Sequence, residues 1–287
     1  MTAPKPTAIL LVCCPDQRGI VAALSSFITE HHGNIIALDQ YVDTEDGVFF
    51  ARMEWEIEGF SLPLDRFADR FAPVARPFRI EWSLRRSGRR LRMAVLVSRQ
   101  AHCLYDILAR HESGEWPADI ALVLSNHDDH RGLAERHGLP FHHIAATAAN
   151  KAETEPRQIA LLKDADVDLV VLARYMQILG PDFVRAFPMR IINIHHSFLP
   201  AFAGARPYQA AHDRGVKIIG ATAHYVTEKL DEGPIIEQDV IRVSHRQGVD
   251  DLVRLGRDLE KIVLSRAIYW HLNHRLLVYK NRTVVFS

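Results

Sequence analysis

The hydrophobic residues follow two different patterns along the chain, and the change comes near residue 90. Before it, apolar runs and alternating apolar residues predict strands, and apolar residues at helical spacing predict helices. The order is strand, helix, strand, strand, helix, strand, over residues 9–14, 20–28, 35–42, 49–57, 64–71 and 78–84. This order is that of a ferredoxin-like βαββαβ unit, which we expect to span residues 1–84.

One predicted strand of this unit shows the clearest alternation. Between residues 49 and 57, apolar side chains at the odd positions alternate with Arg52, Glu54 and Glu56. Successive side chains of a strand point to opposite faces of a sheet. The pattern therefore predicts a sheet that is covered on one face, with Arg52 and its polar neighbours on the solvent side.

The pattern after residue 90 is different. Residues 85–90, R-R-S-G-R-R, are polar and basic, and we interpret them as a solvated linker. Beyond the linker, short apolar runs alternate with helical patterns, which predicts a doubly wound, mostly parallel sheet. The runs lie at 93–97, 120–124, 169–172 and 191–194, and two consecutive strands and a long helix follow at 217–225, 235–243 and 252–263. The expected second domain spans residues 91–287.

Composition excludes several classes of protein. Lys plus Arg and Asp plus Glu are each 35, so the formal net charge is zero and nothing favours nucleic acid or a membrane surface. No apolar run approaches the roughly 18 residues of a membrane span, and the first residues do not resemble a secretory signal. Three cysteines, two of them adjacent, are typical of a reduced protein, so we expect a cytoplasmic location.

Polar residues follow the apolar run at 191–194. Asn193 and His195 are two residues apart, so in an extended segment they face the same side. Open α/β sheets bind ligands at the carboxyl ends of their strands. An asparagine can donate to a developing oxyanion, and a histidine can donate or accept a proton near neutral pH. Spacing alone leaves a second interpretation open, a polar strand end with a buried and satisfied histidine.

Three motifs in order resemble those of the folate-dependent formyltransferases. They are V-L-A-R-Y-M-Q-I-L at 171–179, N-x-H-x-S-x-L-P at 193–200 and L-D-x-G-P-I at 230–235. The resemblance covers roughly residues 91–287. It implies that Asn193, His195 and Asp231 are a catalytic trio, with an oxyanion held by the first two and water activated by the third.

The same resemblance implies a folate pocket. The family holds the pterin with the loop that corresponds to 173–179, so the expected folate-binding residues are Met176, Gln177, Ile178, Leu179 and Thr227. His102 and His196 are expected to line the pocket. No cofactor beyond the folate substrate, 10-formyltetrahydrofolate, and no metal is expected.

Further residues point to one branch of this family. Where transferases that use glycinamide ribonucleotide carry a glycine-rich phosphate loop, residues 98–104 read S-R-Q-A-H-C-L, without glycine. Methionyl-tRNA formyltransferases add a domain after the catalytic one, whereas here the additional domain comes first. Together with segments 102–104, 125–128 and 192–208, this combination resembles the formyltetrahydrofolate deformylases. The resemblance implies hydrolysis of 10-formyltetrahydrofolate to formate and tetrahydrofolate, which supplies formate to purine synthesis and balances the one-carbon pool.

Two other functions stay open at this stage. One is transfer of the formyl group to an amine acceptor, and the other is a folate- or amino-acid-binding regulator without activity. The presence of all three residues of the trio argues against the regulator.

The first domain resembles ACT domains through P-D-x-x-G-I-V at 15–21, directly after its first strand. ACT domains bind amino acids at interfaces between copies, which implies a homo-oligomer and an effector near residues 16–20. Glycine as inhibitor and methionine as activator are the candidates that the resemblance implies. A domain that only assembles the oligomer is the alternative.

Three further groups have simpler interpretations. His127-Asp128-Asp129-His130 has the spacing of metal ligands, but no further ligand cluster is evident, and a surface or pocket loop is favoured. Cys103 could be a thiol nucleophile, which the catalytic trio makes unnecessary. Ser197 lacks the glycine pattern of a nucleophile elbow, so a serine hydrolase is not expected.

Overall fold

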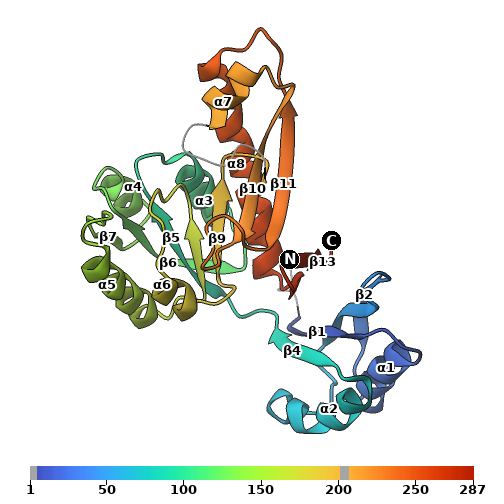
Figure 1. Cartoon of the computed structure of the whole chain (residues 1–287). Helices are drawn as coiled ribbons and strands as arrows, with labels where there is room; N and C mark the ends of the chain where they lie inside the picture. The colour runs from blue at the N-terminus through green and yellow to red at the C-terminus, as the bar shows by residue number, and fades with distance from the viewer. Residues whose placement is uncertain (1–4, 201–206) are drawn as a thin grey trace. The chain divides into compact units, whose positions relative to one another are not determined.

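The computed structural model describes residues 5–200 and 207–287, and the chain forms two compact units (Figure 1). The first unit contains the residues up to Arg89 together with Asn273–Leu277 and Val284–Ser287. The second contains Arg90–Leu272 and Val278–Thr283. Part of the expected deformylase motif, residues 201–206, lies outside the described residues.

The first unit has the predicted βαββαβ order. Its elements are β1 Thr7–Pro15, α1 Ile20–Glu30, β2 Ile35–Asp43, β3 Val48–Glu56, the 3₁₀ turn Leu64–Arg66, α2 Phe67–Ala75, the 3₁₀ turn Arg76–Phe78 and β4 Glu81–Arg86. The strands form one antiparallel sheet in the order β2-β3-β1-β4. The ferredoxin-like, ACT-like fold is therefore confirmed. The expected linker at 85–90 overlaps the end of β4, which reaches Arg86, and β5 begins at Leu91.

The helices cover one face of this sheet, and aromatic rings fill the space between them. Trp55 of β3 stacks on Phe67 of α2 with ring centroids 5.7 Å apart, and Phe67 also lies 5.4 Å from Phe27 of α1. The odd-numbered apolar residues of β3 belong to this core, as the alternation predicts. Large rings buried in this way supply most of the apolar area that stabilises so small a unit.

The prediction that Arg52 faces solvent is wrong. Arg52 is only 2% exposed, and its neighbour Phe50 is 1% exposed, so β3 is buried on both faces. The guanidinium pairs with Glu54 at 2.7 Å, and its Nε donates to the carbonyl oxygen of His274 at 3.2 Å. Residues 273–277 belong to this unit although they follow it by almost 200 positions. A local alternation pattern carries no information about such a distant segment.

The second unit is an α/β sheet domain. Its elements are β5 Leu91–Val97, α3 His102–Glu112, β6 Ala118–Ser125, α4 Arg131–Arg136, β7 Phe141–His143, α5 Lys151–Asp164, β8 Leu169–Leu172, α6 Pro181–Ala186, β9 Ile191–His195, α7 Pro207–Arg214, β10 Ile218–Tyr225, β11 Ile235–Arg242 and α8 Val249–Leu272. A hairpin of β12 Leu276–Tyr279 and β13 Arg282–Val285 ends the chain.

The sheet order is β11-β10-β9-β8-β5-β6-β7. The strands from β9 to β7 pair in parallel, and β10 and β11 join as antiparallel edge strands. The mostly parallel, formyltransferase-like sheet is therefore confirmed. Its central strands β5 and β8 are almost wholly buried, which is typical of parallel strands with helices on both faces.

The topology marks one edge of the sheet as a binding region. The chain leaves β5 toward β6 and later returns to the other side of β5 at β8, so the winding reverses between β5 and β8. In open α/β sheets, ligands bind outside the carboxyl ends of the strands at such a switch point. The carboxyl ends of β5, β8 and β9 carry the residues that the sequence motifs single out.

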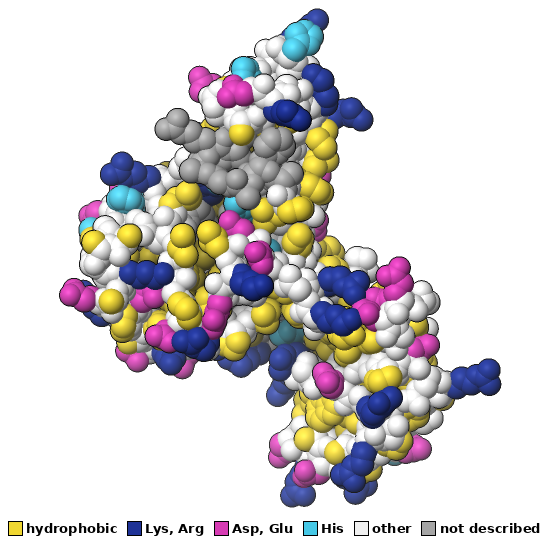
Figure 2. Space-filling model, viewed as in Figure 1, with side chains coloured by type: hydrophobic (Ala, Val, Ile, Leu, Met, Phe, Trp, Pro, Cys, Tyr) yellow, Lys and Arg dark blue, Asp and Glu magenta, His cyan; other side chains and the backbone are white. Residues whose placement is uncertain are grey.

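The surface in view carries charges of both signs. Figure 2 shows Lys and Arg side chains interspersed with Asp and Glu over the face in view. Among the described helices, none combines the length and the apolar character that a membrane crossing requires.

Candidate active site

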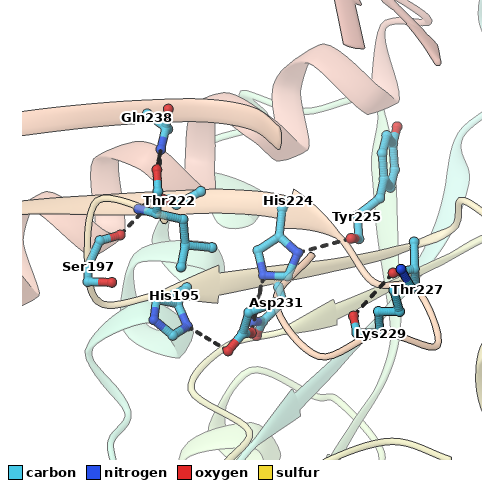
Figure 3. A network of polar contacts seen from close by, with 11 residues as sticks. His195, Ser197, Thr222, His224, Tyr225, Thr227, Lys229, Asp231 and Gln238 are labelled. Atoms are coloured by element: carbon cyan, nitrogen blue, oxygen red, sulfur yellow. Dashed lines mark hydrogen bonds and ion pairs between the residues drawn. The ribbon is translucent and has the colours of Figure 1, made fainter. Parts of the chain in front are cut away.

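The three expected catalytic residues converge on one place: Figure 3 shows His195 beside Asp231, and His224 links Asn193 to the same carboxylate. Asn193 and His195 lie on β9, and Asp231 lies in the turn between β10 and β11. His195 Nδ1 is 3.3 Å from Asp231 Oδ2. The side chain of His195 is buried and that of Asp231 is three-quarters buried, so the pair is shielded from bulk water. A carboxylate at this position orients the imidazole and stabilises its protonated form.

The other nitrogen of His195 is free to meet a substrate. Nε2 is buried and has no hydrogen-bond partner among the described residues. Since Nδ1 faces Asp231, Nε2 is the atom that the ring presents to the site. A buried polar atom without a partner is costly unless a ligand or water satisfies it. This arrangement answers the question that spacing left open, because His195 is not a satisfied core histidine.

The turn that carries Asp231 is held tightly against the sheet. A Cβ at Gly233 would collide with the carbonyl oxygen of Tyr225, so this position requires glycine. The N–H of Tyr225 donates to the carbonyl oxygen of Pro234 at 2.9 Å. Asp231 itself has φ 55°, in the left-handed region where aspartate is among the more tolerated residues. The Asp-x-Gly-Pro sequence therefore aims the carboxylate at His195.

Hydrogen bonds with His195 and His224 lower the pKa of Asp231 well below its ordinary value. Partial burial opposes this shift and is the smaller effect. The carboxylate is therefore ionised throughout the physiological range. In this resting state it can hold a positive charge on His195 or accept a proton, and it has no proton to donate.

Sequence reasoning missed His224 of β10, which is 2% exposed and lies directly opposite Asn193 in the sheet. Its Nδ1 is 2.9 Å from the carbonyl oxygen of Tyr225, which can only accept, so Nδ1 carries the proton. Its Nε2 lies 3.2 Å from Asn193 Nδ2 and 3.6 Å from Asp231 Oδ1. Nε2 therefore faces both side chains: in the neutral ring it accepts a hydrogen bond from the amide of Asn193, and in the protonated ring it donates to the carboxylate of Asp231.

Replacing His224 with Leu should lower turnover while leaving folate affinity nearly unchanged, because it removes the acceptor that orients Asn193. A neutral hydrogen bond of this kind contributes about 0.5–1.5 kcal/mol, which corresponds to roughly 2- to 10-fold in rate. His224→Gln should recover part of the loss. Measurements of steady-state kcat and KM check this prediction, with a substitution of the exposed His212, His212→Ala, as the control. An unchanged kcat would show that His224 does not contribute to the reaction.

The loop after β8 is anchored to the end of β5. Ser98 Oγ accepts a hydrogen bond from the N–H of Met176 at 3.0 Å and donates to Asn126 at 2.7 Å. The N–H of Ser98 donates to the carbonyl oxygen of Arg174 at 3.2 Å. Arg174 has φ 63°, which turns the chain sharply out of the strand. The segment expected to hold the pterin is thus fixed at the switch point of the sheet.

The loop after β8 exposes apolar side chains that can contact an apolar ligand. Met176 and Ile178 are 56% and 62% exposed, which is unusual for large apolar residues. Gln177 and Leu179 are half-buried, and Leu179 packs against the core. Thr227, the other expected folate residue, lies next to Gly233, and its hydroxyl donates to the carbonyl oxygen of Lys229 at 3.2 Å. The folate assignment of these residues stays a prediction.

The loop after His195 is braced by Thr222 of β10. Its hydroxyl donates to the carbonyl oxygen of Ser197 at 2.9 Å and accepts from the N–H of Leu199 at 3.0 Å and from Gln238 at 2.9 Å (Figure 3). The Ser197 hydroxyl is buried without a partner among the described residues. Ser197 therefore presents a second free polar group two residues from His195.

One of the two expected pocket histidines, His196, lies beside the trio. The ring of His196 is 5.2 Å from that of His195, and burial lowers the pKa of His196 to about 4, with the charge of Arg174 adding to the effect. His196 is therefore neutral at physiological pH. His102 opens α3, and its Nε2 lies 2.8 Å from Glu260 of α8.

Two other groups bear on metal and thiol chemistry. In the described ranges, His102, Cys103 and Glu260 form a group whose ligand atoms lie within 4.8 Å of one another. A cation there would have to compete with Arg174, 3.5 Å from the same carboxylate oxygen. Burial raises the pKa of the Cys103 thiol well above its usual value, which disfavours a nucleophilic thiolate. In the other candidate metal group, residues 127–130, the carboxylate of Asp128 forms an ion pair with Arg131 at 2.7 Å.

Comparisons with known proteins agree with this geometry. Residues 91–268 match the family model for formyl transferases, and residues 8–59 match that for the ACT domain. Formyltetrahydrofolate deformylase of Synechocystis sp. is 55% identical over 281 residues, which cover 98% of this chain and 99% of that protein. The same enzyme of Bacillus subtilis is 52% identical, covering 97% of this chain and 93% of that protein.

Solved structures give the same result. Formyltetrahydrofolate deformylase from Pseudomonas syringae pv. tomato superimposes with a TM-score of 0.96 at 46% identity, over 100% of this chain and 96% of that chain. Glycinamide ribonucleotide transformylase 1 from Symbiobacterium toebii gives a TM-score of 0.66 at 35% identity, over 71% of this chain and 98% of that chain. With both domains matched and relatives more than half identical over nearly its whole length, the chain belongs to the formyltetrahydrofolate deformylase family.

Proposed function

We propose that this chain hydrolyses 10-formyltetrahydrofolate to formate and tetrahydrofolate. The observation that carries the proposal is the state of His195, whose Nδ1 is held by Asp231 while its buried Nε2 has no partner among the described residues. When its ring is protonated, a histidine held in this way offers its Nε2–H to the reacting group. The names of the relatives at 55% and 52% identity support the same reaction.

The chemistry follows from the substrate and the three residues. The formyl group sits on an aniline-type nitrogen, N10, which leaves more readily than an alkyl amine. Water attacks the formyl carbon, its proton passes to Asp231, and the carbonyl electron pair moves to oxygen. Asn193 Nδ2–H and His195 Nε2–H stabilise the oxyanion, each such donor contributing about 2.7–4 kcal/mol. The oxyanion pair re-forms the carbonyl, and the carbon–N10 bond breaks with its electron pair on N10. N10 takes up the proton that Asp231 accepted from water, and the formic acid releases its own proton to solvent as formate.

The folate is held by the loop after β8. We assign Met176, Gln177, Ile178 and Leu179 to the pterin pocket, together with Thr227 near the catalytic turn. The exposed Met176 and Ile178 support this assignment, since a flat ring system would cover them. No metal takes part in the proposed reaction. The formate released would supply purine synthesis and balance the one-carbon pool.

The test is a product measurement on the full-length chain. With 10-formyltetrahydrofolate alone, formate and tetrahydrofolate should appear in equal amounts. Formate release only after an amine is added, or a formylated amine in place of formate, would favour the alternative of a formyltransferase. Folate binding without any product would favour a regulator.

We assign residues 1–84 to regulation or assembly, 85–90 to the linker and 91–287 to catalysis. In the first unit, the loop after β1 is tied by the N–H of Asp16 to the carbonyl oxygen of Gly47 at 2.8 Å. Gly19 has φ 92°, a conformation that favours glycine, at the start of α1. This fixed turn supports an amino-acid site near residues 16–20, where two copies of the chain would meet in a cytoplasmic homo-oligomer.

Glycine should reduce formate release and methionine should increase it. An effector acts only through different affinities for two states, and the coupling is typically about 1–3 kcal/mol, or roughly 5- to 150-fold. Titration of each amino acid against the initial rate, with alanine and leucine as controls, checks this expectation. No response to either, with the oligomer intact by light scattering, would leave the first domain with the assembly role alone.

A further inference from the structure

A buried ionic cluster lies next to His196, the neighbour of the catalytic histidine, and takes no part in the proposed chemistry. Glu260 of α8 is 1% exposed, and its partners come from three other segments. Its Oε2 is 2.8 Å from His102 Nε2 and 3.5 Å from Arg174 Nε, and its Oε1 accepts the hydroxyl of Tyr208 at 2.7 Å. We call these four residues the Glu260 cluster.

The charge state of the cluster makes it rigid. Burial by itself would raise the pKa of Glu260, but the hydrogen bond from His102 and the charge of Arg174 outweigh it and lower the pKa. The carboxylate therefore stays ionised and binds its partners by charge-assisted hydrogen bonds. Burial and the same carboxylate raise the pKa of Tyr208, so its hydroxyl remains a donor. Each partner is held in one orientation.

The fold makes room for the tyrosine ring in particular. Gly256 lies one turn before Glu260 on the same face of α8, and a Cβ there would collide with the ring and hydroxyl of Tyr208. The ring thus lies directly on the helix backbone, with its hydroxyl on the next turn. Arg174 is fixed by its backbone as well, since it follows β8 with φ 63° and its carbonyl accepts from Ser98.

The cluster continues to the reacting centre through aromatic contacts. The ring of Tyr208 is 5.9 Å from that of His196, which is 5.2 Å from the ring of His195. Arg174 is two residues before Met176 of the proposed pterin loop. The cluster therefore reaches the site through His196, whose ring contacts both Tyr208 and His195, and its rigid side chains occupy space on that side of the site.

We propose that the Glu260 cluster selects the nucleophile: the side chains of His102 and Tyr208, fixed by Glu260, fill the space that an amine acceptor would need beside His195. Water fits the remaining space, and a substituted amine does not. The inference rests on the proposed hydrolysis. It also explains how this chain and the transformylases, which share a fold at 35% identity, could differ in the nucleophile they use.

The two competing reactions differ only in the attacking atom. The nitrogen lone pair of an amine attacks the formyl carbon, the bond from that carbon to N10 breaks with its pair on N10, and one amine proton is lost while N10 gains one. The products are a formamide and tetrahydrofolate in place of formate and tetrahydrofolate. The ratio of formamide to formate therefore reports the nucleophile directly.

The experiment measures this ratio in the full-length chain with glycinamide as the added amine. The wild type should give formate with little formamide. Tyr208→Ala and His102→Ser should raise the ratio roughly tenfold or more, the range over which pocket volume discriminates between substrates. Tyr208→Phe keeps the ring, so it should raise the ratio of formamide to formate less than Tyr208→Ala does. Tyr105→Ala removes an exposed tyrosine from the same helix as His102 and should leave the ratio unchanged.

Two outcomes would overturn the inference. In the first, both Tyr208→Ala and His102→Ser give the same ratio of formamide to formate as the wild type. In the second, the wild type already formylates glycinamide as fast as it releases formate. His102 is 13% exposed and opens its helix, so His102→Ser tests the inference even if Tyr208→Ala does not fold. A wild type that releases no formate contradicts the proposed function instead, which separates the two failures.

Discussion

Replacing His195 with Ala should lower kcat roughly 10²- to 10³-fold, the usual loss when one oxyanion donor is removed. Tetrahydrofolate should bind with almost unchanged affinity, because the proposed folate residues lie on other segments. His195 is buried with its Nδ1 on Asp231 and its Nε2 free, so its proton matters most when negative charge develops on the formyl oxygen.

Initial rates and the Kd of tetrahydrofolate measure the two effects separately. His212→Ala on α7, outside the site, is the control. A His195→Ala variant with turnover close to that of the wild type would show that another group holds the oxyanion.

Asp231→Asn should lower kcat by roughly 10²- to 10⁴-fold with the fold intact, by comparison with carboxylates that orient a catalytic histidine elsewhere. The amide keeps the size of the side chain but cannot accept the proton of water or stabilise a charged His195. If Asp231→Asn raised KM and left kcat unchanged, Asp231 would be a substrate-binding residue.

A second readout follows from the pKa of Asp231. Because the folded state holds this pKa below its ordinary value, the ionised carboxylate stabilises the fold above about pH 3.9, and this stabilisation is lost as the pH falls toward the folded-state pKa. The difference in thermal midpoint between wild type and Asp231→Asn should therefore be present at neutral pH and shrink in acid. A difference that grew in acid would contradict the contacts of Asp231 with His195 and His224.

The sequence predicted those parts of the site that local pattern can encode. The apolar run before Asn193 and His195 indicated a buried strand with polar groups at its end, and β9 has that form. Asp231 lies among ordinary turn residues, and only the resemblance singled it out. Its position depends on the contact between Gly233 and Tyr225, which no spacing rule describes.

The residues that were missed depend on long-range contacts. His224 stands inside a strand pattern, and its role follows from the pairing of β10 with β9, which places it opposite Asn193. Glu260 is one charged residue on the buried face of α8, and its partners lie more than 50 residues away in the chain. A charged residue at a core position of a helix was the available signal, and it marks a buried ion pair or a site.

The most direct test of hydrolysis is to run the reaction in water enriched in ¹⁸O and analyse the formate by mass spectrometry. Attack of water on the formyl carbon predicts formate with one oxygen from the solvent and one from the formyl group, formed in step with tetrahydrofolate. His195→Ala should form it far more slowly. Formate without solvent oxygen, or a formyl group recovered on an amine, would contradict water as the nucleophile.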